Sequence, residues 1–143
     1  MNKNLCIIAT STQSISAFLE KYIDEFSKKE NQITLISNFS KNQKDYVKLD
    51  FLKKYTNLKK IHIPFSRKPN LFLDIISLFK LIIIFRKNNF DLFFSITPKA
   101  GFISSIAGFF SKINVRVHIF TGQVWYTKKG LVRFILKKFD KLI

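Results

Sequence analysis

Short apolar runs alternate with longer stretches of helical length along the whole chain. The short runs have the composition of strands buried on both faces, and they lie at residues 5–9, 32–37, 61–64, 91–96 and 115–120. The stretches of helical length or spacing lie at 15–26, near 47–55, and at 70–87, 100–112 and 130–143. Because an intervening helix makes consecutive strands parallel, the pattern predicts an α/β fold with a doubly wound, Rossmann-like parallel sheet.

Two of the predicted helices carry recognisable starts. Thr10-Ser11-Thr12 supplies an N-cap for the first helix, and Pro98 suits the first turn of the helix at 100–112. That second helix should lie close against the sheet because it is rich in small residues, namely Ala100, Gly101, Ser104, Ser105, Ala107 and Gly108.

The helix at 70–87 is apolar almost all round, with only a narrow polar stripe of Asp74, Ser77 and Lys80. We expect one face of it to pack on the sheet. The remaining apolar residues, followed by Arg86 and Lys87, fit contact with lipid or with a second domain.

The chain is strongly basic, with a formal net charge of +16 over 143 residues. After Asp91 the only acidic residue is Asp140. This balance favours an anionic partner, either a membrane surface, a phosphorylated substrate or nucleic acid. The basic helix at 130–143 fits an anionic membrane or an ordinary surface position. Specific nucleic-acid binding is not expected, because the chain lacks helix-turn-helix and RNA-recognition patterns.

Several classes of function are excluded by what the sequence lacks. One cysteine, Cys6, and two histidines are too few for a disulfide or a metal cluster. The loop at 10–14 contains no glycine, so neither a dinucleotide fingerprint nor a P-loop is present. No signal peptide is recognisable, and no segment reaches the roughly 18 apolar residues of a spanning helix. The length predicts one domain.

The most informative polar residues follow two of the predicted strands, at 95–101 and 120–123. Both loops carry hydroxyls, glycine and an amide or ammonium group. Ligands of open parallel sheets bind outside the carboxyl ends of the strands, so the two loops together predict a binding site. Thr97 and Pro98 can also simply cap the helix, and Gly122 can simply turn the chain.

Three sequence motifs carry a resemblance to a known family. SITPKAG at 95–101 is followed by VRVHIFTGQVW at 115–125 and by a segment from Gly130 to Asp140-Lys141-Leu142-Ile143. Together they resemble the amino-terminal domain of bacterial glycosyltransferases of family 4, in the branch that builds capsule, O-antigen and other polyprenyl-linked glycans. The resemblance extends more loosely back to residue 1.

This resemblance implies the amino-terminal, acceptor-side half of a GT-B glycosyltransferase. Residues 1–143 would form that domain, incomplete at its carboxy end and without the donor-binding domain. It would then be a fragment, a truncated reading frame or one part of a split enzyme. The nucleotide sugar would be held by a missing carboxy-terminal domain or a partner chain.

The implied reaction is transfer of a sugar from the nucleotide sugar to a polyprenyl-phosphate-linked or polysaccharide acceptor in cell-surface glycan biosynthesis. No metal or other cofactor is expected, and the location would be the inner face of the cytoplasmic membrane. The alternative is a non-catalytic, membrane-associated subunit or a truncated remnant of such an enzyme.

The resemblance also suggests residues for the acceptor site. The expected acceptor contacts are Thr97, Lys99, Gly101, Thr121, Gly122, Gln123 and Trp125. Arg67 is a possible phosphate contact or a solvated turn residue. No catalytic residue is assigned, because Thr121 stands where many relatives have a histidine. His118, inside the strand, is a weak substitute, and His62 is expected to be a packed or surface residue.

Overall fold

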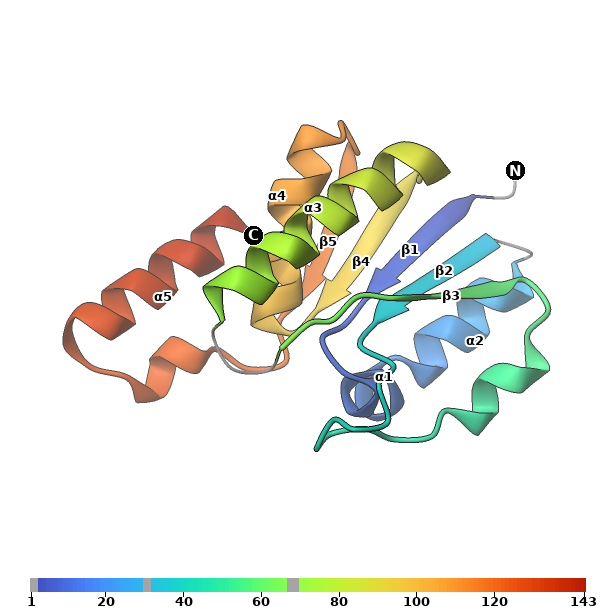
Figure 1. The fold of residues 1–143 in the computed structure, drawn as a ribbon, viewed down its shortest axis with the longest axis horizontal. Coiled ribbons are helices and arrows are strands. Elements are labelled where there is room, and N and C mark those ends of the chain that lie inside the picture. The colour runs from blue at the N-terminus through green and yellow to red at the C-terminus, as the bar shows by residue number, and fades with distance from the viewer. Residues whose placement is uncertain (1–2, 30–31, 67–69) are drawn as a thin grey trace.

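A sheet of five parallel strands forms the centre of the protein (Figure 1). The computed structural model describes residues 3–29, 32–66 and 70–143. The strands are β1 (Asn4–Ile8), β2 (Gln32–Ser37), β3 (Leu58–His62), β4 (Leu92–Ile96) and β5 (Val115–Ile119). They lie in the order β3-β2-β1-β4-β5. The predicted α/β, Rossmann-like fold is therefore confirmed.

Helices connect the strands and cover both faces of the sheet. The helical elements are α1 (Thr12–Phe18), α2 (Glu20–Lys28), η1 (Asp50–Lys54), α3 (Leu71–Asn88), α4 (Pro98–Phe110), η2 (Val124–Thr127) and α5 (Gly130–Leu142). The one helix predicted for 15–26 is in fact two, because the backbone departs from helical geometry at Leu19. The side chain of Leu19 is buried, so the junction between the two helices packs on the core.

Two apolar cores fill the space between the sheet and the helices. One lies under α3 and α4 and contains Cys6, Ile8, Leu81, Phe85, Phe93, Ile103 and Ala107. The other lies under α1, α2 and η1 and contains Ile7, Ile15, Leu19, Ile23, Ile33, Leu35, Leu52 and Ile96. Burial raises the pKa of the Cys6 thiol and keeps it an inert core residue.

The small residues of α4 let it approach the sheet closely, as the sequence predicts. A Cβ added at Gly108 would lie only 2.6 Å from Cε1 of Phe93 on β4. Pro98 occupies the first turn of the helix, where its missing N–H is not needed. The start of α4 is therefore fixed relative to the end of β4.

The sheet topology brings the two predicted loops to one edge. β4 pairs with β5 in parallel, and Ile96 lies opposite Ile119. Thr97 and Phe120, the next residues, therefore leave the sheet at the same carboxyl edge. The strand order reverses between β1 and β4, the place where ligands bind in open α/β sheets.

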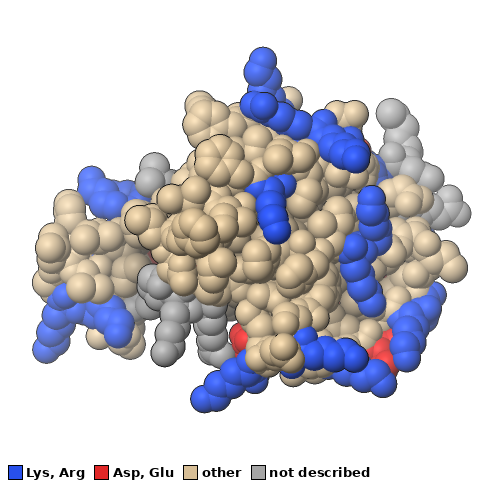
Figure 2. All heavy atoms as spheres, viewed as in Figure 1, with Lys and Arg blue, Asp and Glu red and all other residues tan. Residues whose placement is uncertain are grey.

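The surface of the protein is shaped by α3 and α5. Figure 1 shows α3 in front of the sheet and α5 extending outward beyond β5. In the same view, the surface over α3 is largely uncharged, with Lys and Arg around it (Figure 2). Within the described ranges, no helix combines the length and the apolar composition needed to cross a bilayer.

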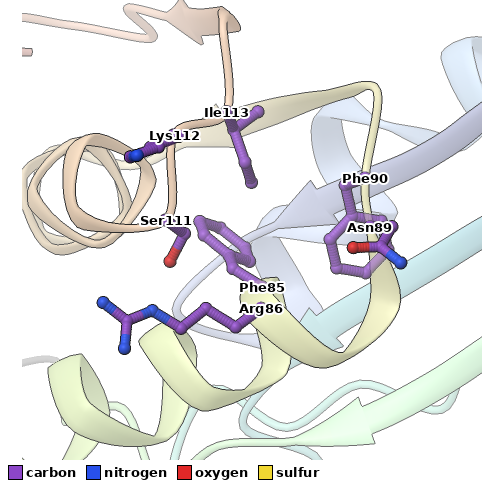
Figure 3. Close-up of a pocket in the computed structure, with 7 residues that line it drawn as sticks. All are labelled: Phe85, Arg86, Asn89, Phe90, Ser111, Lys112 and Ile113. Carbon is purple, nitrogen blue, oxygen red and sulfur yellow. The ribbon is translucent and has the colours of Figure 1, made fainter.

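A hollow of about 320 Å³ lies at the amino edge of the sheet, opposite the predicted site (Figure 3). It is formed where α3 and α4 end, and Arg86, Ser111 and Lys112 contribute its polar lining. A second hollow, of about 440 Å³, lies beside α1 and α2 and is lined by Glu20, Lys21, Asp24 and Lys54 among others.

Candidate functional site

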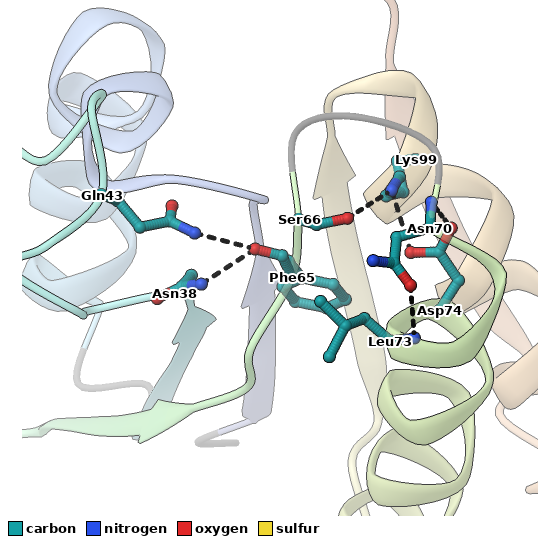
Figure 4. Close-up of polar contacts among 8 residues, drawn as sticks. All are labelled: Asn38, Gln43, Phe65, Ser66, Asn70, Leu73, Asp74 and Lys99. Carbon is teal, nitrogen blue, oxygen red and sulfur yellow. Dashed lines mark hydrogen bonds and ion pairs between the residues drawn. The ribbon is translucent and has the colours of Figure 1, made fainter.

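Lys99, in the first turn of α4, contacts Asp74 and Ser66 at the carboxyl edge. Its Nζ lies 2.9 Å from Oδ1 of Asp74 and donates to Oγ of Ser66 at 3.0 Å (Figure 4). The side chain of Lys99 is 17% exposed and that of Asp74 is 25% exposed. The lysine is thus fixed in place and partly neutralised, while its ammonium group stays near the surface.

The loop after β3 is tied across the same edge. The carbonyl of Phe65 accepts hydrogen bonds from Nδ2 of Asn38 at 2.8 Å and from Nε2 of Gln43 at 3.1 Å (Figure 4). Ser66, the next residue, contacts Lys99. The segments that follow β2, β3 and β4 therefore form one connected polar network.

Asn70 and Asp74 set the start of α3 within this network. Oδ1 of Asn70 accepts from the N–H of Leu73 at 3.1 Å, an ordinary N-cap contact. Oδ2 of Asp74 accepts from the N–H of Asn70 at 3.3 Å, while Oδ1 of the same carboxylate pairs with Lys99. One carboxylate therefore connects the start of α3 to the start of α4.

Thr97 occupies an unusual backbone conformation at the end of β4. Its φ is +78° and its ψ is 135°, a combination that β-branched residues rarely adopt. It is the N-cap residue of α4, but its side chain makes no capping hydrogen bond. Oγ1 is buried and has no hydrogen-bond partner among the described residues. Strain together with an unused hydroxyl is typical of a residue held in place for a ligand.

Gly101 has a packing role in this structure. It is buried in α4 against the ring of His118, and an added Cβ would lie 2.5 Å from two ring atoms. The glycine thereby allows α4 to approach β5. Of the predicted acceptor contacts around the start of α4, Thr97 and Lys99 are partly buried and Gly101 is fully buried.

His118 forms a pair with Ser95 across the sheet. The two residues are register partners on β5 and β4, and Nδ1 of His118 lies 2.9 Å from Oγ of Ser95. Nε2 is buried and finds no partner within the part of the chain that the structure describes. Burial lowers the pKa of His118, and the carboxylate of Asp140 opposes this with a smaller effect. The imidazole is therefore held neutral beneath α4.

The loop after β5 presents exposed polar groups. Thr121, Gly122 and Gln123 are all exposed. Gly122 has a φ of +149°, and nothing lies within 4 Å of the position of an added Cβ. This loop is open enough to contact a large polar ligand such as a saccharide.

Trp125 faces α5. Its Nε1 donates to Oδ2 of Asp140 at 2.7 Å, and Nζ of Lys137 lies 4.5 Å from the ring centroid. The neighbouring Tyr126 is strongly exposed. The indole of Trp125 is half-buried because α5 folds back onto it.

The remaining sequence candidates lie elsewhere. Arg67, the possible phosphate contact, falls outside the described residues. His62 is exposed, and its Nδ1 accepts from the N–H of Phe39 at 3.1 Å, so it is the surface residue expected. No group of three or more possible metal-ligating residues occurs within the described ranges.

The structure shows which residues hold Lys99 and His118 in place. Ser66 and Asp74 hold Lys99, and Ser95 holds His118. Asp74 carried a usable signal, because a lone acid in an otherwise apolar helix usually has a partner. The other two depend on contacts between distant segments, which no local pattern indicates.

Comparisons with known proteins point to a class of enzyme. The chain is similar to the capsular polysaccharide biosynthesis glycosyltransferase CapM of Staphylococcus aureus, with 30% identity over 141 residues. The match covers 99% of this chain but only 34% of CapM, so the chain spans about a third of the length of this curated relative. The similarity supports a relationship to glycosyltransferases. No protein-family model matches the chain.

A solved structure shares the fold. The crystal structure of the C-terminal domain of PF1911 hydrogenase from Pyrococcus furiosus superposes with a TM-score of 0.50 and 15% sequence identity. The match covers 84% of this chain and 93% of that one. At this identity the likeness concerns the architecture of the sheet and helices alone.

Proposed function

We propose that the chain forms the acceptor-binding side of a glycosyltransferase in bacterial cell-surface glycan biosynthesis. The reaction would transfer a sugar from a nucleotide sugar to a polyprenyl-linked or polysaccharide acceptor. The observation that carries the proposal is the 30% identity to CapM, which extends over 99% of the chain and so includes both loops of the candidate site.

The geometry of the carboxyl edge supports a phosphate-bearing acceptor. The start of α4 carries the positive end of the helix dipole. The buried hydroxyl of Thr97 and the ammonium group of Lys99 belong to the same turn. Backbone N–H groups at a helix start, together with a lysine, bind phosphate oxygens well. These groups would hold the pyrophosphate that links lipid to sugar.

The exposed loop Thr121-Gly122-Gln123 would contact the sugar of the acceptor. An amide and a hydroxyl offer the donors and acceptors that saccharide hydroxyls need. Trp125 would act indirectly, because its indole anchors α5 through Asp140. The nucleotide sugar would be bound by a carboxy-terminal domain or partner chain, and we assign no catalytic base.

The proposal places the protein at the inner face of the cytoplasmic membrane, as a peripheral protein. The formal charge of +16 supports this location, because that leaflet is rich in anionic lipid. The acceptor would be a lipid anchored in the same membrane.

Binding of a short-chain, water-soluble polyprenyl pyrophosphate-linked saccharide tests the proposal. Trp125 is the only tryptophan of the chain, so its fluorescence reports on the site. We expect saturable binding, weakened about tenfold by Gln123→Ala through loss of a hydrogen bond to the ligand. Gln32→Ala, at the opposite edge of the sheet, serves as the matched control and should bind normally.

Two results would contradict the proposal. One is equal affinity for inorganic pyrophosphate and for the saccharide-bearing ligand, which would indicate binding by charge alone. The other is an equal loss of affinity in Gln123→Ala and Gln32→Ala, which would show that the ligand does not bind at the loop after β5.

A further inference from the structure

The outer face of α3 carries an unusual line of exposed apolar side chains. Phe72, Ile75, Phe79 and Ile83 follow one another at helical spacing on one stripe. Phe79 is 62% exposed and Ile83 is 64% exposed. The opposite side of the helix buries Ser77 and Phe85 against the sheet. The helix is therefore apolar on the side that faces solvent as well as on the side that faces the core.

The end of α4 continues this apolar surface. Nη2 of Arg86 donates to the carbonyl of Phe110 at 3.2 Å, which places the last turns of α3 and α4 side by side. Phe109 is 69% exposed and Phe110 is 55% exposed. Their rings lie edge to face, with centroids 5.6 Å apart.

We refer to these residues together as the α3 face. It comprises Leu71, Phe72, Ile75, Phe79, Ile83, Phe109 and Phe110. At about 200 Å² for each fully exposed side chain of this size, they expose on the order of 900 Å². Soluble monomers rarely expose more than about 300–600 Å² in one apolar patch. A partner is therefore needed to cover the α3 face.

The charges around the α3 face identify the kind of partner. Lys80, Arg86, Lys87 and Lys112 are all exposed beside it. Figure 2 shows Lys and Arg on and around the uncharged surface, with Asp and Glu visible only toward the lower margin. Asp74, the only acid of α3, is occupied by Lys99. Apolar side chains ringed by cations match the interface of an anionic bilayer.

The hollow at the end of the α3 face is lined by groups that suit the binding of a lipid headgroup. It is lined by Arg86 and Lys112, with the hydroxyl of Ser111 between them and the rings of Phe85 and Phe90 on its apolar side (Figure 3). Guanidinium and ammonium groups bind phosphate oxygens. The exposed rings of Phe109 and Phe110 would lie among acyl chains.

The other end of the α3 face adjoins the candidate site. Leu71 and Phe72 lie in the first turn of α3, the same turn from which Asp74 pairs with Lys99. A lipid that left the membrane along α3 would arrive directly at the carboxyl edge. A protein partner would not need this continuity, so the arrangement favours a bilayer.

We propose that the α3 face docks onto an anionic lipid bilayer, with the apolar stripe inserted at the level of the headgroups and the flanking cations on lipid phosphates. The inference deepens the membrane location proposed above and rests on the proposed function for the identity of the lipid-linked substrate. The docking itself requires only bilayer lipid.

Flotation of the chain with phosphatidylcholine vesicles, with and without phosphatidylglycerol, tests the docking. We expect binding to the anionic vesicles, weakened by added salt. Phe79→Ser with Ile83→Ser should reduce partitioning at least about tenfold through lost apolar burial. Lys80→Gln with Lys87→Gln should reduce it about thirtyfold through lost charge.

Phe18→Ser with Tyr22→Ser provides the matched control, because these apolar residues are 49% and 47% exposed on α1 and α2. That variant should bind within about twofold of the unchanged chain. Urea unfolding of every variant separates loss of binding from loss of folding. Equal weakening in the control and in the α3 variant would overturn the proposal.

Sedimentation equilibrium supplies the second readout. If the α3 substitutions dissolve a dimer and leave vesicle binding unchanged, the α3 face joins two copies of the chain and the docking proposal is wrong. The vesicles contain no polyprenyl lipid and the acceptor titration contains no vesicles. Docking and acceptor binding can therefore fail independently.

Discussion

Gly101 on α4 lies directly against the imidazole of His118 on β5. A Cβ at position 101 would come within 2.5 Å of Cε1 and Nδ1 of the ring, far inside normal contact distance. The same ring is held by Oγ of Ser95, which lies 2.9 Å from Nδ1. The glycine therefore sets how closely α4 approaches the sheet, and with it the position of Thr97 and Lys99 at the edge.

Gly101→Ala should lower the free energy of unfolding by about 1–3 kcal/mol, because the methyl group overpacks the space held by His118. Inside a helix, replacing glycine by alanine usually raises the free energy of unfolding by about 0.5–1 kcal/mol. A decrease in Gly101→Ala would therefore indicate overpacking. Urea unfolding measures the change. In a His118→Ala background most of the loss should disappear, and an equal loss in both backgrounds would show that the ring is not the obstacle.

His118 should make the stability depend on pH. Burial lowers its pKa, so the unfolded chain, with a histidine pKa of about 6.5, binds the proton more readily. The contribution of His118 to the free energy of unfolding should be fully present above about pH 6.5. It should be lost as the pH drops toward the pKa of His118 in the folded state. Urea unfolding across this range measures the slope, which His118→Asn should reduce.

A proton NMR titration of His118 provides the direct check on that slope, because it reports the protonation of this ring itself. A midpoint for His118 above 6.5 would show that the imidazole is stabilised as a cation, against the burial argument.

The sequence predicted the architecture because its signals are local. Short apolar runs separated by helical stretches leave few topologies for a parallel sheet. The third strand was the least well placed, since it runs from Leu58 to His62 and not from 61 to 64. Lys59 and Lys60 are exposed on this edge strand. Because these residues are charged, the first half of the strand lacks the apolar pattern from which the other strands were predicted.

The candidate site was only partly predictable because its decisive contacts join distant segments. Lys99 and Gln123 could be placed at one edge from the order of strands alone. The register that sets Ser95 opposite His118 has no local sign in the sequence. The positive φ of Thr97 was also not predictable from the sequence, since a threonine before a helix usually indicates an ordinary N-cap.

Thr97→Gly should raise stability and weaken acceptor binding at once. Glycine adopts a φ of +78° without strain, so the free energy of unfolding should increase by about 1 kcal/mol. The loss of Oγ1 should weaken binding of the pyrophosphate-linked saccharide about tenfold. Thermal unfolding and the fluorescence titration measure the two effects.

Asn89→Gly is the control for Thr97, because Asn89 also has a positive φ, of 47°, but lies at the amino edge of the sheet. Asparagine tolerates this left-handed conformation, so stability should change by only a few tenths of a kcal/mol. Acceptor affinity should not change. If Thr97→Gly left affinity intact as well, the strained threonine would serve only to turn the chain into α4.

Asp74→Asn should lower the stability of the protein and raise its affinity for the acceptor. Lys99 would lose the carboxylate 2.9 Å from its Nζ while remaining only 17% exposed, so the free energy of unfolding should fall by about 1–3 kcal/mol. The ammonium group should then bind the pyrophosphate-linked saccharide several-fold more tightly, since the carboxylate of Asp74 no longer competes with the ligand. Glu25→Gln breaks an exposed ion pair with Lys28 and should change stability by less than about 1 kcal/mol and affinity not at all. Weaker binding in Asp74→Asn would mean that the carboxylate positions Lys99 for the acceptor and does not mask it.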